Sequence, residues 1–272
     1  GLSHTSLAAL VDAPAGLDAE RKDERERKLR ALAVRHALER SAPELPQWFR
    51  LATDALEQRN HFLLDGRDGV PRSAELASCV WPLLALGHGG ATHSVTFRYL
   101  GLGTLSSSIG GIASLQRMSL EGNALTQLPS TLSSLTALES LDVSRNHLAK
   151  VPESVWACGA LRSLRLSHNA IQDLNSLPSM APCARSLVML DVSHNLLKTL
   201  PGPLGQLRQL RQLDASHNAL ETLAPAVVDL EAHALVSFHL AANAVTAAAL
   251  LLDARVRGGC ARACIQNKCA PT

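Results

Sequence analysis

A Ser-His-Asn triplet occurs three times in the sequence, and these residue types often do chemistry. The copies lie in LRLSHNAI (164–171), LDVSHNLL (190–197) and LDASHNAL (213–220). In the second and third copies an aspartate stands two residues before the serine. Histidines beside Ser, Asn and Asp suggest either a row of metal ligands or a hydrolase site. The regular spacing of the three copies, however, points to a structural repeat.

The triplets belong to a longer repeat whose fixed point is an asparagine. The asparagines follow one another at steps of 23, 23, 26, 23 and 25 residues. Apolar residues precede each asparagine by eight, five and three positions and follow it by two. A less regular unit comes first, with Val95, Phe97 and Leu102 in register and Leu100 in place of the asparagine. We therefore expect about seven units over residues 91–245, with an asparagine ladder of Asn123, Asn146, Asn169, Asn195, Asn218 and Asn243.

The pattern LxxLxLxxNxL resembles the leucine-rich repeat family. The second halves of the units, such as LTQLPSTLSSL and LKTLPGPLGQL, resemble the 23-residue intracellular class found in Ras-suppressor, Scribble and plant Ras-group proteins. The resemblance implies an α/β solenoid with a curved parallel β-sheet on its concave face and irregular or 3-10 segments on its convex face. The LxL alternation agrees, because it places two leucines on one face of a short strand. The asparagine amide both donates and accepts, so it can satisfy the turn that follows.

The flanking segments are expected to cap the solenoid, whose ends would otherwise expose apolar core. Residues 1–90 are predicted to form a helical N-terminal segment, with helices over 17–40, 45–64 and 73–87; a separate partner-binding role is the alternative. Residues 246–272 are predicted to hold a closing helix and a cysteine-containing tail. The tail spacing C-x3-C-x4-C is a poor match to a structural zinc site, which takes four ligands. We expect no metal there, and the only candidate ligands are Cys260, Cys264 and Cys269.

The repeat also argues against a site at the histidines. His168, His194 and His217 occupy one position of successive units, and equivalent side chains in a parallel stack project side by side. Ligands of a single metal must converge on it instead. The sequence contains no G-x-S-x-G, H-E-x-x-H, phosphate-loop or dinucleotide-binding motif. We therefore expect no catalytic residues, no cofactor and no enzymatic activity.

The outward-facing positions of the strands are the candidate binding surface. Arg and Tyr, which are enriched at interface hot spots, gather on the first four units. The predicted partner-binding residues are Arg98, Tyr99, Arg117, Glu121, Arg145 and Arg165. We expect a protein partner to contact this half of the concave face.

Composition sets limits on the partners and the compartment. The chain of 272 residues has 26 basic and 24 acidic residues, which gives no electrostatic reason to expect a nucleic-acid partner. No apolar run approaches the roughly 18 residues that span a bilayer, so no membrane partner is expected. Three of the six cysteines are scattered along the chain, which favours a reducing, intracellular and above all cytoplasmic location; organellar and cytoskeletal locations stay open.

These features predict a non-catalytic protein–protein interaction module, an adaptor or scaffold subunit within a multi-subunit assembly. Two alternatives remain. The chain could be a regulatory subunit of an enzyme such as a GTPase, phosphatase or ubiquitin ligase. It could also be a structural component of a ribonucleoprotein or of a cytoskeletal or axonemal assembly.

Overall fold

The computed structural model describes residues 61–67, 92–223 and 235–244. The chain divides into two compact units, 1–63 and 64–272; apart from residues 61–63, all the described residues belong to the second. The helices predicted over 17–40 and 73–87, the closing helix and the tail cysteines lie outside the described residues.

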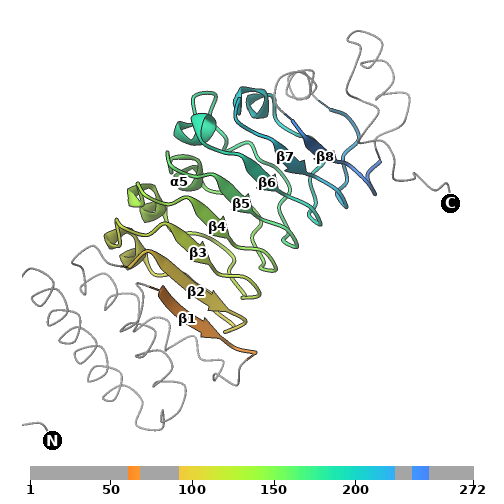
Figure 1. Cartoon of the computed structure of the whole chain (residues 1–272). Coiled ribbons are helices and arrows are strands. Elements are labelled where there is room, and N and C mark those ends of the chain that lie inside the picture. Colours follow the sequence, from red (N-terminus) through yellow and green to blue (C-terminus); the bar gives the residue numbers. More distant parts are fainter. Residues whose placement is uncertain (1–60, 68–91, 224–234, 245–272) are drawn as a thin grey trace, which may run out of the picture. The chain divides into compact units, whose positions relative to one another are not determined.

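Short parallel strands, one in each repeat, form an open curved sheet (Figure 1). Their central residues pair directly from strand to strand, as in Leu141 with Leu164 and Leu190 with Leu213, and these residues are buried. The expected leucine-rich repeat solenoid fold is therefore confirmed. The strands are β2 (Ser94–Arg98), β3 (Arg117–Ser119), β4 (Ser140–Asp142), β5 (Ser163–Arg165), β6 (Met189–Asp191), β7 (Gln212–Asp214) and β8 (Ser237–His239).

The prediction of a helix over 45–64 is wrong at its C-terminal end, where β1 (His61–Asp65) is a strand. A tight turn follows it. Asp65 Oδ1 accepts the N–H of Arg67 at 3.0 Å, and the Gly66 N–H donates to the Arg98 carbonyl at 2.8 Å. A Cβ on Gly66 would lie 2.1 Å from the Tyr99 carbonyl oxygen, so only glycine permits this close approach. The rest of this predicted helix, residues 45–60, lies outside the described residues.

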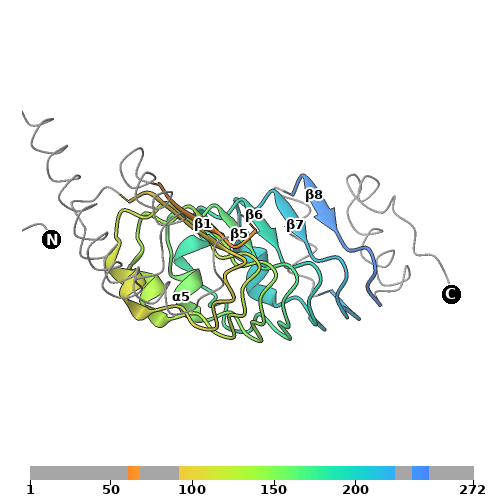
Figure 2. The ribbon, with the colours of Figure 1, turned by 90° about the horizontal axis from the view of Figure 1, so that it is seen from below.

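In each of the five repeats that begin with β2 to β6, one short helical turn lies on the side opposite the strands (Figure 2). Each turn buries an apolar residue, such as Ile109, Leu132 or Leu204, against the inward side chains of the strands. Proline at or beside the start of several turns limits their length. The turns are η1 (Ser107–Gly111), η2 (Ser130–Ser134), α5 (Glu153–Trp156), η3 (Pro182–Arg185) and η4 (Gly202–Gln206).

The repeat asparagines join each unit to the one before it. The Asn195 amide illustrates the pattern: Oδ1 accepts the Ile171 N–H at 3.0 Å, and Nδ2 donates to the Leu166 carbonyl at 3.0 Å. Both partners belong to the preceding repeat, while further bonds run to Val192 and Ser193 in its own repeat. The same arrangement recurs at the other asparagines. The buried turns therefore obtain their hydrogen bonds from asparagine side chains.

Candidate functional site

The residue before each repeat asparagine, and Tyr99 before Leu100 at the same position of the first unit, has left-handed backbone that orients its side chain. Glycine adopts it freely, and His, Asn and Asp tolerate it better than most other residues. Three histidines therefore suit this position for a conformational reason. The φ angles are 55° at Tyr99, 72° at Gly122, 57° at Arg145, 55° at His168, 52° at His194, 53° at His217 and 54° at Ala242.

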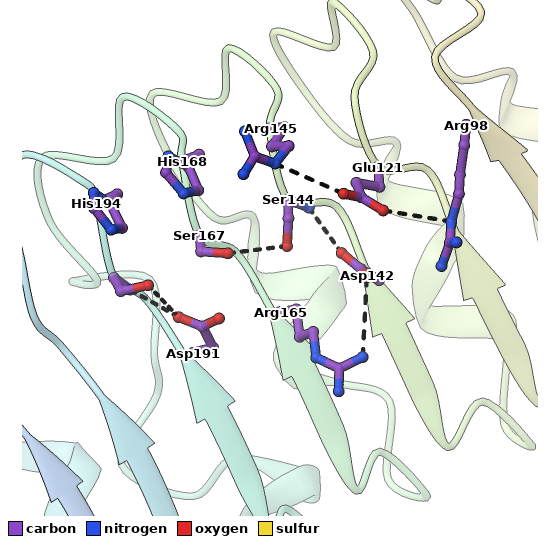
Figure 3. Close-up of a pocket in the computed structure, with 11 residues that line it drawn as sticks. Arg98, Glu121, Asp142, Ser144, Arg145, Arg165, Ser167, His168, Asp191 and His194 are labelled. Carbon is purple, nitrogen blue, oxygen red and sulfur yellow. Dashed lines mark hydrogen bonds and ion pairs between the residues drawn. The ribbon is translucent and has the colours of Figure 1, made fainter. Parts of the chain in front are cut away.

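A shallow polar hollow of about 510 Å³ lies on the strand face between the repeats of β2 and β6 (Figure 3). We call this feature the polar hollow. Its charged groups balance, with three arginines against three carboxylates. Its lining residues are Arg98, Glu121, Asp142, Ser144, Arg145, Arg165, Ser167, His168, Asp191, Ser193 and His194.

Glu121 is the centre of the N-terminal part of the polar hollow. Its carboxylate lies 3.5 Å from Arg98 Nε and 3.7 Å from Arg145 Nε, and it accepts the Tyr99 hydroxyl at 2.8 Å. This hydrogen bond raises the pKa of Tyr99, with smaller contributions from burial and from the Glu121 charge. The Tyr99 ring is further fixed by the Arg67 guanidinium, 4.5 Å from its centroid.

Gly122 makes room for that ring. A Cβ at this position would lie 2.3 Å from two atoms of the Tyr99 ring, and the backbone φ of 72° also favours glycine. Tyr99 is therefore held by packing on one side and by hydrogen bonding at its hydroxyl. It shapes the end of the polar hollow without lining it.

Aspartates further along the sheet form hydrogen bonds with serines of their own repeats. Asp191 Oδ1 accepts both the N–H and the hydroxyl of Ser193, at 3.0 and 2.7 Å, and Asp214 binds Ser216 in the same way. Asp142 accepts the N–H of Ser144 and lies 4.0 Å from Arg165 Nη1. These Asp-x-Ser bonds hold the chain as it leaves each strand. They also fix the orientation of each carboxylate.

The three histidines form a stacked row along the rim of the polar hollow. The ring centroids of His168 and His194 are 4.1 Å apart at an interplanar angle of 9°, and those of His194 and His217 are 4.1 Å apart at 8°. Figure 3 shows the first two rings face to face, with Arg145 in the same row. Partial burial lowers the pKa of His168, and the neighbouring His194 lowers it further.

The structure brings together four of the six residues predicted to bind a partner. Arg98, Glu121, Arg145 and Arg165 line the polar hollow, whereas Tyr99 packs beside it. The sixth, Arg117, is exposed on β3 and is not part of the lining. The sequence analysis did not anticipate the Asp-x-Ser hydrogen bonds, although the repeated DxS spacing is a visible signal for such turns.

Several other features bear on the chemistry of the described residues. No group of three or more His, Cys, Asp or Glu side chains in these ranges is placed to hold a metal ion. Within the same ranges, no helix is long and apolar enough to cross a bilayer. Cys158 and Cys183 are buried free thiols, and burial raises the pKa of each to about 11. A thiol with so high a pKa is a poor nucleophile at neutral pH.

Comparison with known proteins agrees with the repeat geometry. Residues 159–220 match the model of the leucine rich repeat family. No curated protein matches the chain. Among solved structures, a leucine-rich repeat protein of Leptospira interrogans is 21% identical with a TM-score of 0.46, over 66% of this chain and 55% of that one.

A second similar structure is the plant peptide hormone receptor RGFR1 in complex with RGF2. It is 26% identical with a TM-score of 0.46, over 57% of this chain and 26% of that one. The chain thus spans about half and about a quarter of the lengths of these two proteins. Leucine-rich repeats typically form a non-catalytic fold that mediates protein–protein interaction. The described part of the chain is a leucine-rich repeat solenoid, and residues 159–220 match the family model.

Proposed function

We propose that the chain is a non-catalytic adaptor or scaffold that binds a protein partner in the polar hollow. The observation that carries this proposal is the nature of the hollow itself. Its charged side chains come from five successive repeats and face one open surface. A rigid sheet that presents fixed charges is well suited to select a partner by complementary charge.

Two arginines of the polar hollow are well placed to bind a partner. Side-chain exposure is 54% for Arg145 and 47% for Arg165, and their ion pairs are long, at 3.7 and 4.0 Å. Exposed pairs of this kind contribute little to folding, so both arginines can exchange partners at low cost. The aspartates of the hollow, in contrast, each accept a hydrogen bond from a serine N–H, Asp142 from Ser144 and Asp191 from Ser193. Arg145 and Arg165 are therefore the side chains from which we expect binding specificity.

We place the protein in a reducing intracellular compartment, most simply the cytoplasm. The support is that Cys158 and Cys183 are both buried as free thiols, which is how cysteines are commonly used where disulfides do not form. Membership of the 23-residue intracellular repeat class is part of the same proposal, as is a place in a multi-subunit assembly. A regulatory subunit of an enzyme would use the polar hollow in the same way.

The test is affinity capture from native cell extract with the full chain and two charge-reversal variants. Arg165→Glu changes the polar hollow. Arg211→Glu makes the same charge change at an exposed residue beside β7 that is not part of the lining. We expect quantitative mass spectrometry to show specific proteins lost with Arg165→Glu and kept with Arg211→Glu. Equal capture by both variants would contradict the proposal.

A further inference from the structure

The histidine row continues the line of Arg145 along the rim of the polar hollow. All four residues, Arg145, His168, His194 and His217, stand before a repeat asparagine and have φ between 52° and 57°. They are exposed. We call this row the rim strip. Successive members lie in the turns that follow adjacent parallel strands, so the strip runs across the sheet.

The imidazoles of the rim strip have unused hydrogen-bonding capacity. Within the described ranges, no side chain or backbone group hydrogen-bonds to a ring nitrogen of His168, His194 or His217, and their contacts are the stacking of ring on ring. The nearby carboxylates are already engaged, Asp191 with Ser193 and Asp214 with Ser216. Exposed rings without such bonds are available to a ligand.

A single metal ion is not that ligand. The outer two rings are roughly 8 Å apart, because each step of the stack is 4.1 Å. Three nitrogens on one zinc ion would each lie about 2.0–2.1 Å from it, which this straight row does not allow. The rings lie parallel and do not converge on one point.

The charges around the rim strip favour an anionic ligand. The charged groups of the polar hollow balance, with three arginines against three carboxylates. Each proton taken up by a ring adds a positive charge beside Arg145 and beside its neighbours in the stack. The charges of Arg145, His194 and His217 disfavour protonation of His168, whereas the charge of Asp191 favours it. A bound anion would reduce the repulsion, so anion binding and proton uptake must promote each other.

We propose that the rim strip docks a carboxylate-rich segment of a protein partner and holds it more tightly as the pH falls from 7.5 to 5.5. This inference rests on the proposed function, because it names the class of partner segment that the same surface takes. Glu and Asp of such a segment stay ionised over this range, and their negative charge favours proton uptake by His168 against the neighbouring groups that disfavour it. Arg145 supplies the positive charge that does not depend on pH.

The test is fluorescence anisotropy of the full chain with a short labelled peptide of alternating Glu and Gly, at pH 7.5 and pH 5.5 and constant ionic strength. We expect the affinity to rise about tenfold or more on acidification, since coupling to a pKa shift of one unit gives a factor of ten. The same peptide with Gln for Glu should bind weakly at both pH values. A flat pH response of the wild-type chain would overturn the proposal.

The matched variant replaces His168, His194 and His217 by asparagine, which also tolerates left-handed backbone but does not titrate. Its binding should be weak and independent of pH, while its far-UV circular dichroism stays that of the wild type. If the variant keeps the pH response, the rim strip is not responsible. An oligonucleotide of equal charge that binds as tightly as the peptide would also overturn the assignment to a protein segment.

These outcomes are separable from a failure of the proposed function. If the Glu peptide does not bind but captured proteins are still lost with Arg165→Glu, the polar hollow binds a partner and only the acidic-segment inference fails. If neither readout depends on these residues, both proposals fail.

Discussion

Replacement of Asn195 by alanine should destabilise the solenoid, and the size of the effect depends on which of its hydrogen-bond partners are left without another partner. The side chain is 6% exposed and makes four hydrogen bonds, three from Nδ2 and one to Oδ1. The three carbonyls that accept from Nδ2 each keep another donor: Asn169 for Leu166, Asn218 for Val192, and the His168 N–H for Ser193.

The Ile171 N–H is in a different position, because the Asn195 oxygen is its acceptor and none replaces it in the alanine variant. Ile171 is fully buried. One orphaned buried donor costs about 1–3 kcal/mol, whereas carbonyls that keep one partner lose little. We therefore expect Asn195→Ala to lower the free energy of unfolding by about 1–3 kcal/mol, and not by the sum over four bonds.

The assay is urea unfolding of the full chain followed by circular dichroism, with the midpoint and the slope both fitted. The control is His194→Asn, which changes the adjacent exposed residue, keeps a side chain suited to φ of 52°, and should change stability by less than about 0.5 kcal/mol. Asparagine is a better control than alanine because alanine tolerates left-handed backbone poorly. If Asn195→Ala were silent and His194→Asn strongly destabilising, the division between structural Asn and surface His would be refuted.

Two further predictions concern the left-handed positions. Gly122→Ala should lower the melting temperature, because left-handed backbone costs a non-glycine residue about 1–2 kcal/mol and the new Cβ would overlap the Tyr99 ring. The control is Gly202→Ala, where nothing lies within 4 Å of the new Cβ, and it should leave the melting temperature unchanged. The pKa of His168 is lower in the folded chain than in the unfolded chain, so below pH 6.5 the unfolded chain takes up this proton first and stability falls. His168→Asn should reduce the loss of stability between pH 7.5 and 5.5 in urea unfolding, and an equal loss in both proteins would contradict this reasoning.

The strands were predictable from the sequence because their signal is local and repeated. The pairs Leu141/Val143 and Leu164/Leu166 show the alternation, and the structure pairs Leu141 with Leu164 as the repeat requires. The turn at Gly66 was not predictable, because it depends on a close approach to the Tyr99 backbone.

The candidate site was predictable only in part. Arg98, Glu121, Arg145 and Arg165 were placed on one face by counting positions, which needs only the repeat length. The side-by-side row of His168 and His194 was likewise expected from their equivalent positions in the repeat, but their left-handed backbone was not, because φ cannot be read from a leucine pattern. The packing of Tyr99 on Gly122 likewise depends on how one repeat lies against the next.

Site-specific photo-crosslinking tests the central claim, that the strand face holds a protein partner, most directly. Two variants are compared. The first carries a crosslinking residue in place of Arg117, an exposed residue of β3 beside the polar hollow. The second carries it in place of Ser134, an exposed residue of η2 on the opposite side. We predict that the first captures a defined partner in cells and that competition with unlabelled full chain removes the product, while the second captures none. The same partner crosslinked from Ser134 but not from Arg117 would contradict the account.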